Sequence, residues 1–340
     1  MKYLLTCLLL LSYLTQAYGQ DPEFSQYYAA PLYLNPAFAG TTTDHRFIAN
    51  YRNQWPSIGR GYVSYAFSYD YNLYHMNSGI GLMATVDQAG TAGMKSSTIN
   101  FIYSYRLHLN DKWVVSSGLN FGFGSRTIDL NKLVFGDQLQ FDAEGNVPTD
   151  DQAAFNLGTA NYFDFNAGFL LYNRSVWLGM AMSHLNTPNR SLVSETSELP
   201  LKTTIHGGAR IPLYWGPQSR DRATVLLPSF VYKKQDNFDQ LDIGAYLMYE
   251  PILFGFWYRG IPIQQNVKDN LSQDAFVFIL GFQFDRLELG YSYDFTVSEL
   301  GPASGGTHEL SMRYKMPLKI SAKGKRIQKM IPCPTSPKQK

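Results

Sequence analysis

The sequence predicts an all-β protein, a transmembrane antiparallel β-barrel of about 14 strands. Apolar and polar residues alternate along many short segments, aromatic residues make up 15% of the chain, and charged residues only 16%. Mean hydropathy is −0.22, so the apolar residues are spread in alternation and not gathered in blocks. In outer-membrane barrels, apolar side chains face lipid, polar ones face the lumen, and aromatics gather at both interfaces. A soluble β-sandwich is the alternative, which we disfavour because soluble domains seldom carry this much Tyr and Phe.

Residues 1–19 have the features of a secretory signal peptide. Lys2 provides the basic start, residues 4–14 form an apolar run, and residues 17–19 form a small-x-small cleavage site. The run is too short to cross a bilayer as a helix. Cleavage there leaves Cys333 as the only cysteine, which excludes an internal disulfide. We therefore expect an exported protein that resides in the outer membrane of a Gram-negative-type cell.

Residues 20–43 are predicted to form an irregular segment ahead of the barrel. Pro22, Pro31 and Pro36 each fix φ and remove a backbone donor, which argues against a sheet strand. The segment is nonetheless rich in aromatic side chains, which normally need burial. We expect it to plug or line the lumen, or to pack at the periplasmic mouth. Its candidate plug or partner-binding residues are Phe24, Tyr27, Tyr28, Tyr33, Asn35 and Phe38.

Residues 44–316 are predicted to form the barrel wall. In residues 61–72, the odd positions from 63 to 71 are apolar or aromatic and the even positions from 64 to 72 are small or polar. Residues 98–107, 274–284 and 286–298 show the same period of two, which places one row toward lipid and the other toward the lumen. Read with this template, the strands begin near His45, Gly61, Ser78, Lys95, Lys112, Asn161, Ser175, Lys202, Arg222, Asp239, Ile252, Asp274, Arg286 and Thr307.

Short and long connections alternate along the predicted wall. The tight turns are residues 109–112, 172–175, 250–251 and 284–287, and the longer connections are 54–60, 129–160, 186–201, 260–273 and 299–306. This alternation is typical of barrels with periplasmic turns and extracellular loops. Residues 210–221 are an exception, a longer turn on the periplasmic side. An even strand number predicts that both termini lie in the periplasm.

Residues 317–340 are predicted to form a short basic tail on the periplasmic side. From residue 315 onward the chain carries eight basic residues and no acidic one. A solvated extension is one interpretation of such a tail. The other is a docking element for periplasmic assemblies or peptidoglycan, with Lys323, Lys325, Arg326 and Lys329 as the candidate contact residues.

Three stretches of the chain resemble the PorP/SprF family of the type IX secretion system. Residues 21–40 read DPEFSQYYAAPLYLNPAFAG, a nearly unbroken match to the opening signature of that family, and residues 177–185 and 306–314 resemble it as well. The resemblance implies a non-enzymatic outer-membrane component of type IX secretion. Such a component assists the secretion or surface retention of cargo such as large adhesins, including those used in gliding motility, and contacts periplasmic subunits. The alternative function is an outer-membrane transport channel for small or hydrophobic solutes.

Catalytic and metal-binding patterns are absent from the sequence. The candidate histidines are scattered over separate predicted strands, with no nucleophile elbow nearby: His45, His108, His184, His206 and His308. No HExxH, CxxC or paired Cys/His spacing appears, so we expect no cofactor and no zinc. The acidic residues between 137 and 151 are a candidate calcium site, although a solvated loop is favoured because their spacing does not fit an EF-hand. Residues 118–124 are glycine-rich, but they lie in a strand pattern with no helix after them, so they are interpreted as lumen-facing small residues. We expect no nucleic-acid partner.

Overall fold

The structure is a computed structural model, and it describes residues 21–58, 61–90, 93–133, 157–193, 196–213, 224–265, 271–297 and 301–317. Three predictions therefore lie outside the described residues. These are the signal peptide, the candidate calcium loop, and the basic tail with Lys323, Lys325, Arg326 and Lys329.

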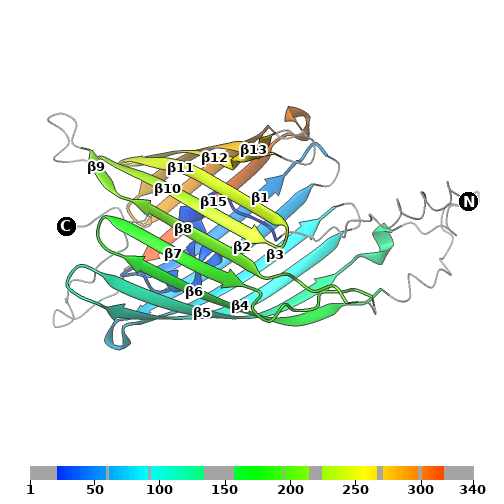
Figure 1. Cartoon of the computed structure of the whole chain (residues 1–340), viewed down its shortest axis with the longest axis horizontal. Coiled ribbons are helices and arrows are strands. Elements are labelled where there is room, and N and C mark those ends of the chain that lie inside the picture. Colours follow the sequence, from blue (N-terminus) through cyan, green and yellow to red (C-terminus); the bar gives the residue numbers. More distant parts are fainter. Residues whose placement is uncertain are drawn as a thin grey trace, which may run out of the picture.

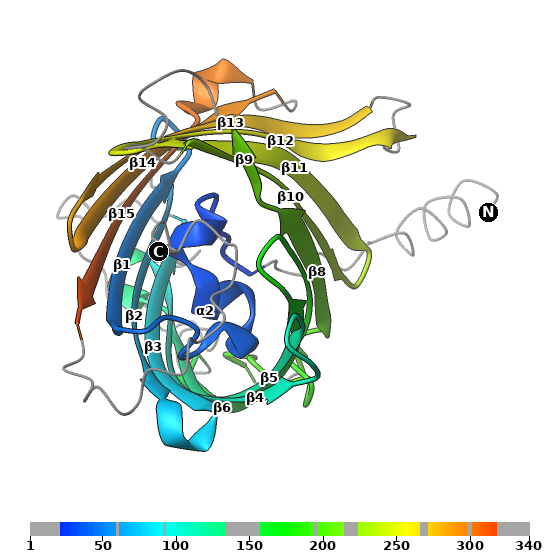
Figure 2. The same cartoon turned by 90° about the vertical axis from the view of Figure 1, so that its left-hand side faces the viewer.

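The described residues form one closed antiparallel β-barrel (Figures 1 and 2). Consecutive strands pair in chain order, β1 pairs with β15, and β10 pairs with β11. The short β9 and the longer β8 both pair with β10 and together fill one place in the wall, so the wall has 14 strands. The strands are β1 (His45–Gln54), β2 (Tyr62–Leu73), β3 (Ser78–Ala89), β4 (Met94–His108), β5 (Val114–Thr127), β6 (Ala160–Tyr172), β7 (Val176–Ser183), β8 (Lys202–Ala209), β9 (Ile211–Leu213), β10 (Thr224–Gln235), β11 (Phe238–Tyr249), β12 (Ile252–Gln265), β13 (Leu271–Phe284), β14 (Leu287–Thr296) and β15 (Thr307–Met316).

The apolar and polar residues that alternate in the sequence lie on opposite faces of the barrel wall. In β4, Phe101, Tyr103 and Tyr105 are exposed on the outside, whereas Ser104 and Arg106 are buried on the inside. Such a strand places one side-chain row in lipid and the other in the lumen. The predicted fold class is confirmed, and the largest difference in a strand start is Asp274 against Leu271. In the predicted turn at 210–221, the structure has the short strand β9, which pairs with the first residues of β10. No helix in the described part of the chain is long and apolar enough to cross a membrane.

Residues 21–44, here called the lumen segment, lie inside the ring of strands (Figure 2). The segment forms three short helical turns, η1 (Tyr27–Ala29), α2 (Pro31–Leu34) and η2 (Pro36–Phe38). Prolines start two of these turns, where a missing N–H costs nothing and the fixed φ suits a helix. Asn35 caps the third turn, because its side-chain oxygen accepts a hydrogen bond from the Ala37 N–H at 2.9 Å. The prolines therefore stop the segment from joining the sheet and give it a compact form that fits the lumen.

The lumen segment runs from one end of the barrel to the other. Asp21 contacts His184, just after β7, and Lys202, at the start of β8, and we call this the long-loop end. Gly40 lies against Asn72 and Gly79, beside the turn between β2 and β3, and we call this the short-turn end. β15 ends at the short-turn end, because His45 pairs with Met316. The prediction that both termini share one end was therefore wrong for the described chain. An even strand count fixes the ends of β1 and β15, but the segment before β1 doubles back through the lumen.

Candidate functional site

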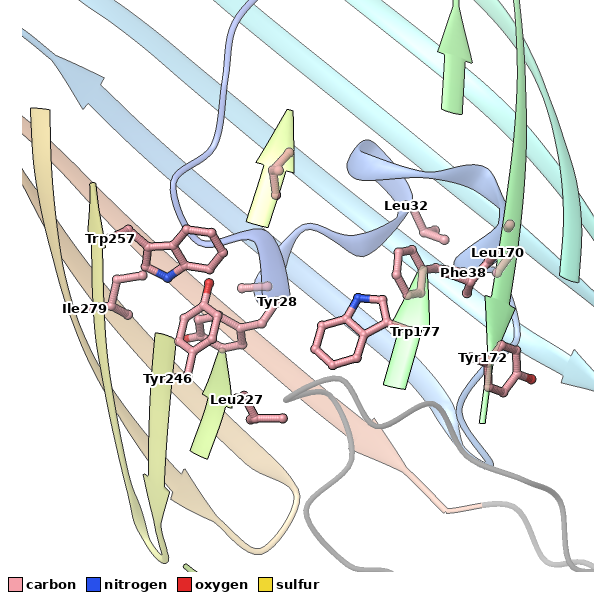
Figure 3. Packing of buried hydrophobic residues seen from close by; sticks show 14 of the residues in the cluster. Tyr28, Leu32, Phe38, Leu170, Tyr172, Trp177, Leu227, Tyr246, Trp257 and Ile279 are labelled. Carbon is pink, nitrogen blue, oxygen red and sulfur yellow. The ribbon is translucent and has the colours of Figure 1, made fainter. Parts of the chain in front are cut away.

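An apolar cluster fills the half of the lumen near the short-turn end. Tyr28, Leu32 and Phe38 of the lumen segment are buried there, together with large side chains that point inward from the wall (Figure 3). The wall residues of this cluster include Leu170, Tyr172, Trp177, Leu227, Tyr246, Trp257 and Ile279. Burying side chains of this size contributes roughly 1.5–3 kcal/mol for each one. The cluster therefore holds the segment in place and closes the lumen at this depth.

Glycines in the wall let the backbone of the lumen segment approach closely. A Cβ atom at Gly118 of β5 would lie 2.4 Å from the Ala37 backbone nitrogen, and one at Gly79 of β3 would lie 2.2 Å from the Ala39 carbonyl oxygen. Neither contact leaves room for a larger residue, because the neighbouring atoms are backbone. Gly118 thus faces the lumen, as interpreted from the sequence, and the structure adds what it accommodates.

A buried ion pair and a further arginine anchor the part of the lumen segment at the short-turn end. Arg46 binds Asp70 through two nitrogens, with Nε 2.6 Å from Oδ1 and Nη2 3.0 Å from Oδ2. The same Nη2 donates to the Phe38 carbonyl oxygen at 3.1 Å, and Asp70 accepts from the Gly40 N–H at 2.8 Å. Arg106 donates to the Gly40 carbonyl oxygen and, at 2.6 Å, to Asn72. One wall pair therefore satisfies both a carbonyl and an N–H of the segment.

A second charged network binds the segment nearer the long-loop end. The Ser25 and Gln26 N–H groups donate to the two carboxylate oxygens of Glu309 at 2.7 and 3.1 Å. Arg52 donates to Glu309 at 3.2 Å, and Arg259 donates to Asp294 at 3.1 Å. All four of these wall side chains are buried. Sequence analysis missed them, although each is a charge in a lumen-facing row of a membrane strand, which is itself a signal of function.

The aromatic residues predicted from the sequence all lie in the lumen. Tyr27 donates to Asp242 and packs edge-on to Trp257 at 5.2 Å between ring centroids. Tyr28 packs on Tyr246 at 5.4 Å. The remaining candidates contact as follows: Phe24 with Tyr33 at 5.1 Å, Tyr33 with the Pro22 carbonyl, Asn35 with the Phe169 and Met180 carbonyls at 3.1 and 3.2 Å, and Phe38 with the His206 ring at 5.4 Å.

The histidines meet separate partners in the part of the chain that the structure describes, and His184 meets Asp21 and Asp164. His206 meets Asn35 inside the lumen, whereas His45 and His308 meet tyrosines of neighbouring strands. Over the same residues, no group of three His, Cys, Asp or Glu side chains is placed to hold a metal ion.

A cavity of about 820 Å³ occupies the half of the lumen near the long-loop end, and we call it the vestibule. Residues 21–24 of the lumen segment cross it, and Leu32, Tyr33 and Pro36 of the same segment also line it. On the side of β2 to β5 its wall carries hydroxyl and amide groups together with the charged side chains of Asp87 and Arg126; the uncharged polar residues include Ser64, Thr85, Ser96, Thr98, Asn100 and Asn120. The vestibule is in the size range of ligand pockets, about 300–1,000 Å³.

Asp21 anchors the lumen segment in the vestibule, at the long-loop end of the barrel. Its Oδ2 lies 2.6 Å from His184 Nε2 and 3.8 Å from Lys202 Nζ, and its Oδ1 lies 3.8 Å from Arg190 Nη1. Burial alone would raise the pKa of Asp21, but these three cations lower it by a larger amount. The pKa of Asp21 is therefore well below its usual range. Burial lowers the pKa of His184, and the carboxylates of Asp21 and Asp164 outweigh burial and raise that pKa to about 9.

The Asp21 contact is expected to weaken at alkaline pH. Since the pKa of His184 is raised on folding from 6.5 to about 9, its contribution is complete below 6.5 and is lost as pH rises through about 9. Asp21 stays ionised over this range, as its pKa is lowered, and Asp87, Asp164, Arg190 and Lys202 are the other charged groups that face the pair. With Cys333 replaced by serine so that one site is labelled, a nitroxide at Pro22→Cys should gain mobility between pH 7 and 10. The same label with His184→Gln should show no such step, and an unchanged spectrum in the parent would refute the prediction.

The fold and this site define a plugged transmembrane β-barrel, whose own N-terminal segment crosses and fills part of its lumen. The chain belongs to the PorP/SprF family, described as type IX secretion system membrane proteins, and the match covers residues 16–314. The resemblance stated from the sequence is confirmed. The chain is thus an outer-membrane component of type IX secretion.

The chain is also similar to three solved barrels at low identity. The Ralstonia pickettii toluene transporter TbuX is 9% identical with a TM-score of 0.47, and the P. putida toluene transporter TodX is 11% identical with a TM-score of 0.47. In both cases the match covers 85% of this chain and 94% of the other. The CymD monoaromatic hydrocarbon channel is 13% identical with a TM-score of 0.44, and the match covers 86% of this chain and 94% of that one. No curated protein sequence matches the chain.

Proposed function

We propose that the protein is a non-enzymatic docking barrel that assists the secretion or surface retention of cargo proteins such as large adhesins, including adhesins of gliding motility. The cargo contacts the barrel through its own C-terminal domain, and the membrane partner is outer-membrane lipid around the apolar wall. The basic tail at residues 317–340 docks periplasmic type IX subunits or peptidoglycan through Lys323, Lys325, Arg326 and Lys329.

The lumen segment is the observation that supports docking over transport. A solute channel needs an open path, but this segment is bonded to opposite walls, to Glu309 on β15, to Lys233 on β10 through Glu23, and to the Phe169 carbonyl of β6 through Asn35. Removing it would expose the apolar cluster and leave several buried charges without their partners. A closed barrel with a polar vestibule at one end fits a protein that is bound by another protein.

The two functions predict different results for the purified protein and for cells. A docking barrel in a planar bilayer should give no stable single-channel steps, and cells that lack the protein should lose cargo adhesin from their surface while they still take up small solutes. Regular conductance steps from the unmodified barrel, together with normal surface adhesin in the deletion strain, would instead support the transport channel.

A further inference from the structure

We propose that the vestibule is a binding site for an extended peptide that carries a carboxylate, and that this carboxylate takes the place of Asp21. The proposal rests on the docking function above and identifies the chemistry of the group that docks. Asp21 is then an internal stand-in for the guest, held at the anion site made by His184, Arg190 and Lys202.

The anion site is built before any guest arrives. The side chains of His184, Arg190 and Lys202 are 11%, 16% and 11% exposed, so their charges are largely removed from water and held by the wall. Arg126 lies beside them and donates to the Arg190 carbonyl at 3.4 Å, which fixes the loop that carries Arg190. Three cationic groups that converge on one carboxylate favour any carboxylate that reaches the same position.

Residues 21–23 of the lumen segment can leave this site while the rest of the segment stays in place. Residues 21–23 are half-buried and hold the wall through the side chains of Asp21 and Glu23. Residues 24–26 are buried, and the backbone N–H groups of residues 25 and 26 are bonded to Glu309. At the short-turn end, the segment is fixed by Arg46, Asp70 and the apolar cluster. Exchange of Asp21 for another carboxylate therefore breaks a few side-chain contacts and leaves the closure of the lumen in place.

The rest of the vestibule suits the main chain of a peptide. Its wall between β2 and β5 carries hydroxyl and amide groups, which can donate to and accept from peptide units, and the Asp87 carboxylate, which can accept from a peptide N–H. The Asn120 side chain lines this wall, and its Oδ1 atom is buried and has no hydrogen-bond partner among the described residues. A buried acceptor without a donor is costly, so a turn of this side chain toward a peptide N–H in the vestibule would be stabilising. Phe24 and Tyr33 border the same space and provide apolar contact for a side chain of the guest.

The binding experiment uses the full-length protein in nanodiscs and peptides labelled at the N-terminus with an uncharged BODIPY dye, because the dye must not bring a carboxylate of its own. The first probe is BODIPY-Gly-Ser-Gly-Tyr-Gly with a free C-terminal carboxylate, the second is its C-terminal amide, and the third is an amide with Asp in place of Tyr. Fluorescence anisotropy should detect binding of one or both carboxylate peptides and not of the uncharged amide. The first and third probes separate a terminal carboxylate from a side-chain carboxylate as the recognised group.

Two variants should change the affinity in opposite directions. Asp21→Asn removes the internal competitor and should tighten binding by about three- to tenfold. Lys202→Gln weakens the anion site and should loosen binding by about the same factor. Asp111→Asn and Lys112→Gln, which make the same chemical changes in an exposed turn at the short-turn end, are the matched controls and should leave the affinity unchanged.

The proposal is overturned if Asp21→Asn and Lys202→Gln both bind like the parent, or if the uncharged amide binds as well as the carboxylates. Competition by inorganic phosphate at equal strength would show a general anion site and would also overturn the peptide assignment. These results leave the docking function standing as long as surface cargo still depends on the protein. Loss of that dependence would refute the docking function itself.

Discussion

Replacing Arg46 by methionine is expected to lower the free energy of unfolding by about 3–5 kcal/mol, because the Asp70 carboxylate would stay buried without its cation. The side chains of Arg46 and Asp70 are 0% and 1% exposed, and the pair also binds the Phe38 carbonyl and the Gly40 N–H. The variant should therefore unfold at lower urea concentration in lipid vesicles, as followed by tryptophan fluorescence. The lumen segment around Phe38 and Gly40 should also become accessible to protease.

Two further variants separate the burial of charge from the loss of a side chain. Arg286→Met removes an arginine from the exposed pair with Asp285, where Nε and Oδ2 are 3.6 Å apart, and should leave the unfolding midpoint nearly unchanged. The double variant Arg46→Met with Asp70→Leu leaves no unpaired charge and should be more stable than Arg46→Met alone. If Arg46→Met unfolds like the parent, or if the double variant is the weaker of the two, the buried pair does not have this role.

The barrel was predictable because its sequence signal is local. Each strand alternates between lipid and lumen over about 10 residues, and the alternation can be read without knowing which strands are neighbours. Exposed Phe101 and buried Ser104 in β4 follow that rule directly. The burial of residues 21–43 was predictable in kind, since aromatic residues between prolines need a packed environment but cannot join a sheet.

The direction and the anchors of the lumen segment were not predictable in the same way. Ser25 and Glu309 are 284 residues apart in the chain and meet only because β15 closes the ring against β1. His184 resembles any strand-end histidine in the sequence, and only the path of the segment brings Asp21 to it. An inward charge can be recognised from the alternation, but its partner depends on the stagger of the whole barrel.

Replacing Gly118 by alanine is expected to lift the η2 turn off the wall and to open a conducting path. The new Cβ would lie 2.4 Å from both the Ala37 nitrogen and the Pro36 carbonyl carbon, and neither backbone atom can rotate away. Overpacking of this kind costs about 1–3 kcal/mol, which is about a five- to 150-fold shift in the equilibrium between seated and displaced segment. Planar-bilayer recordings should then show conductance steps that the parent lacks.

The neighbouring glycine of the same strand gives the matched control. A Cβ at Gly122 would meet the Asn100 side-chain oxygen at 2.6 Å, while the nearest backbone atom, the Asp164 oxygen, is 3.4 Å away. A side-chain amide can move where a backbone turn cannot, so Gly122→Ala should leave the barrel closed. Both variants keep the strand pattern, so both should insert and should shift on gels after heating as the parent does. Conductance steps in Gly122→Ala, or a silent Gly118→Ala that has inserted normally, would show that the contact at Ala37 does not keep the segment seated.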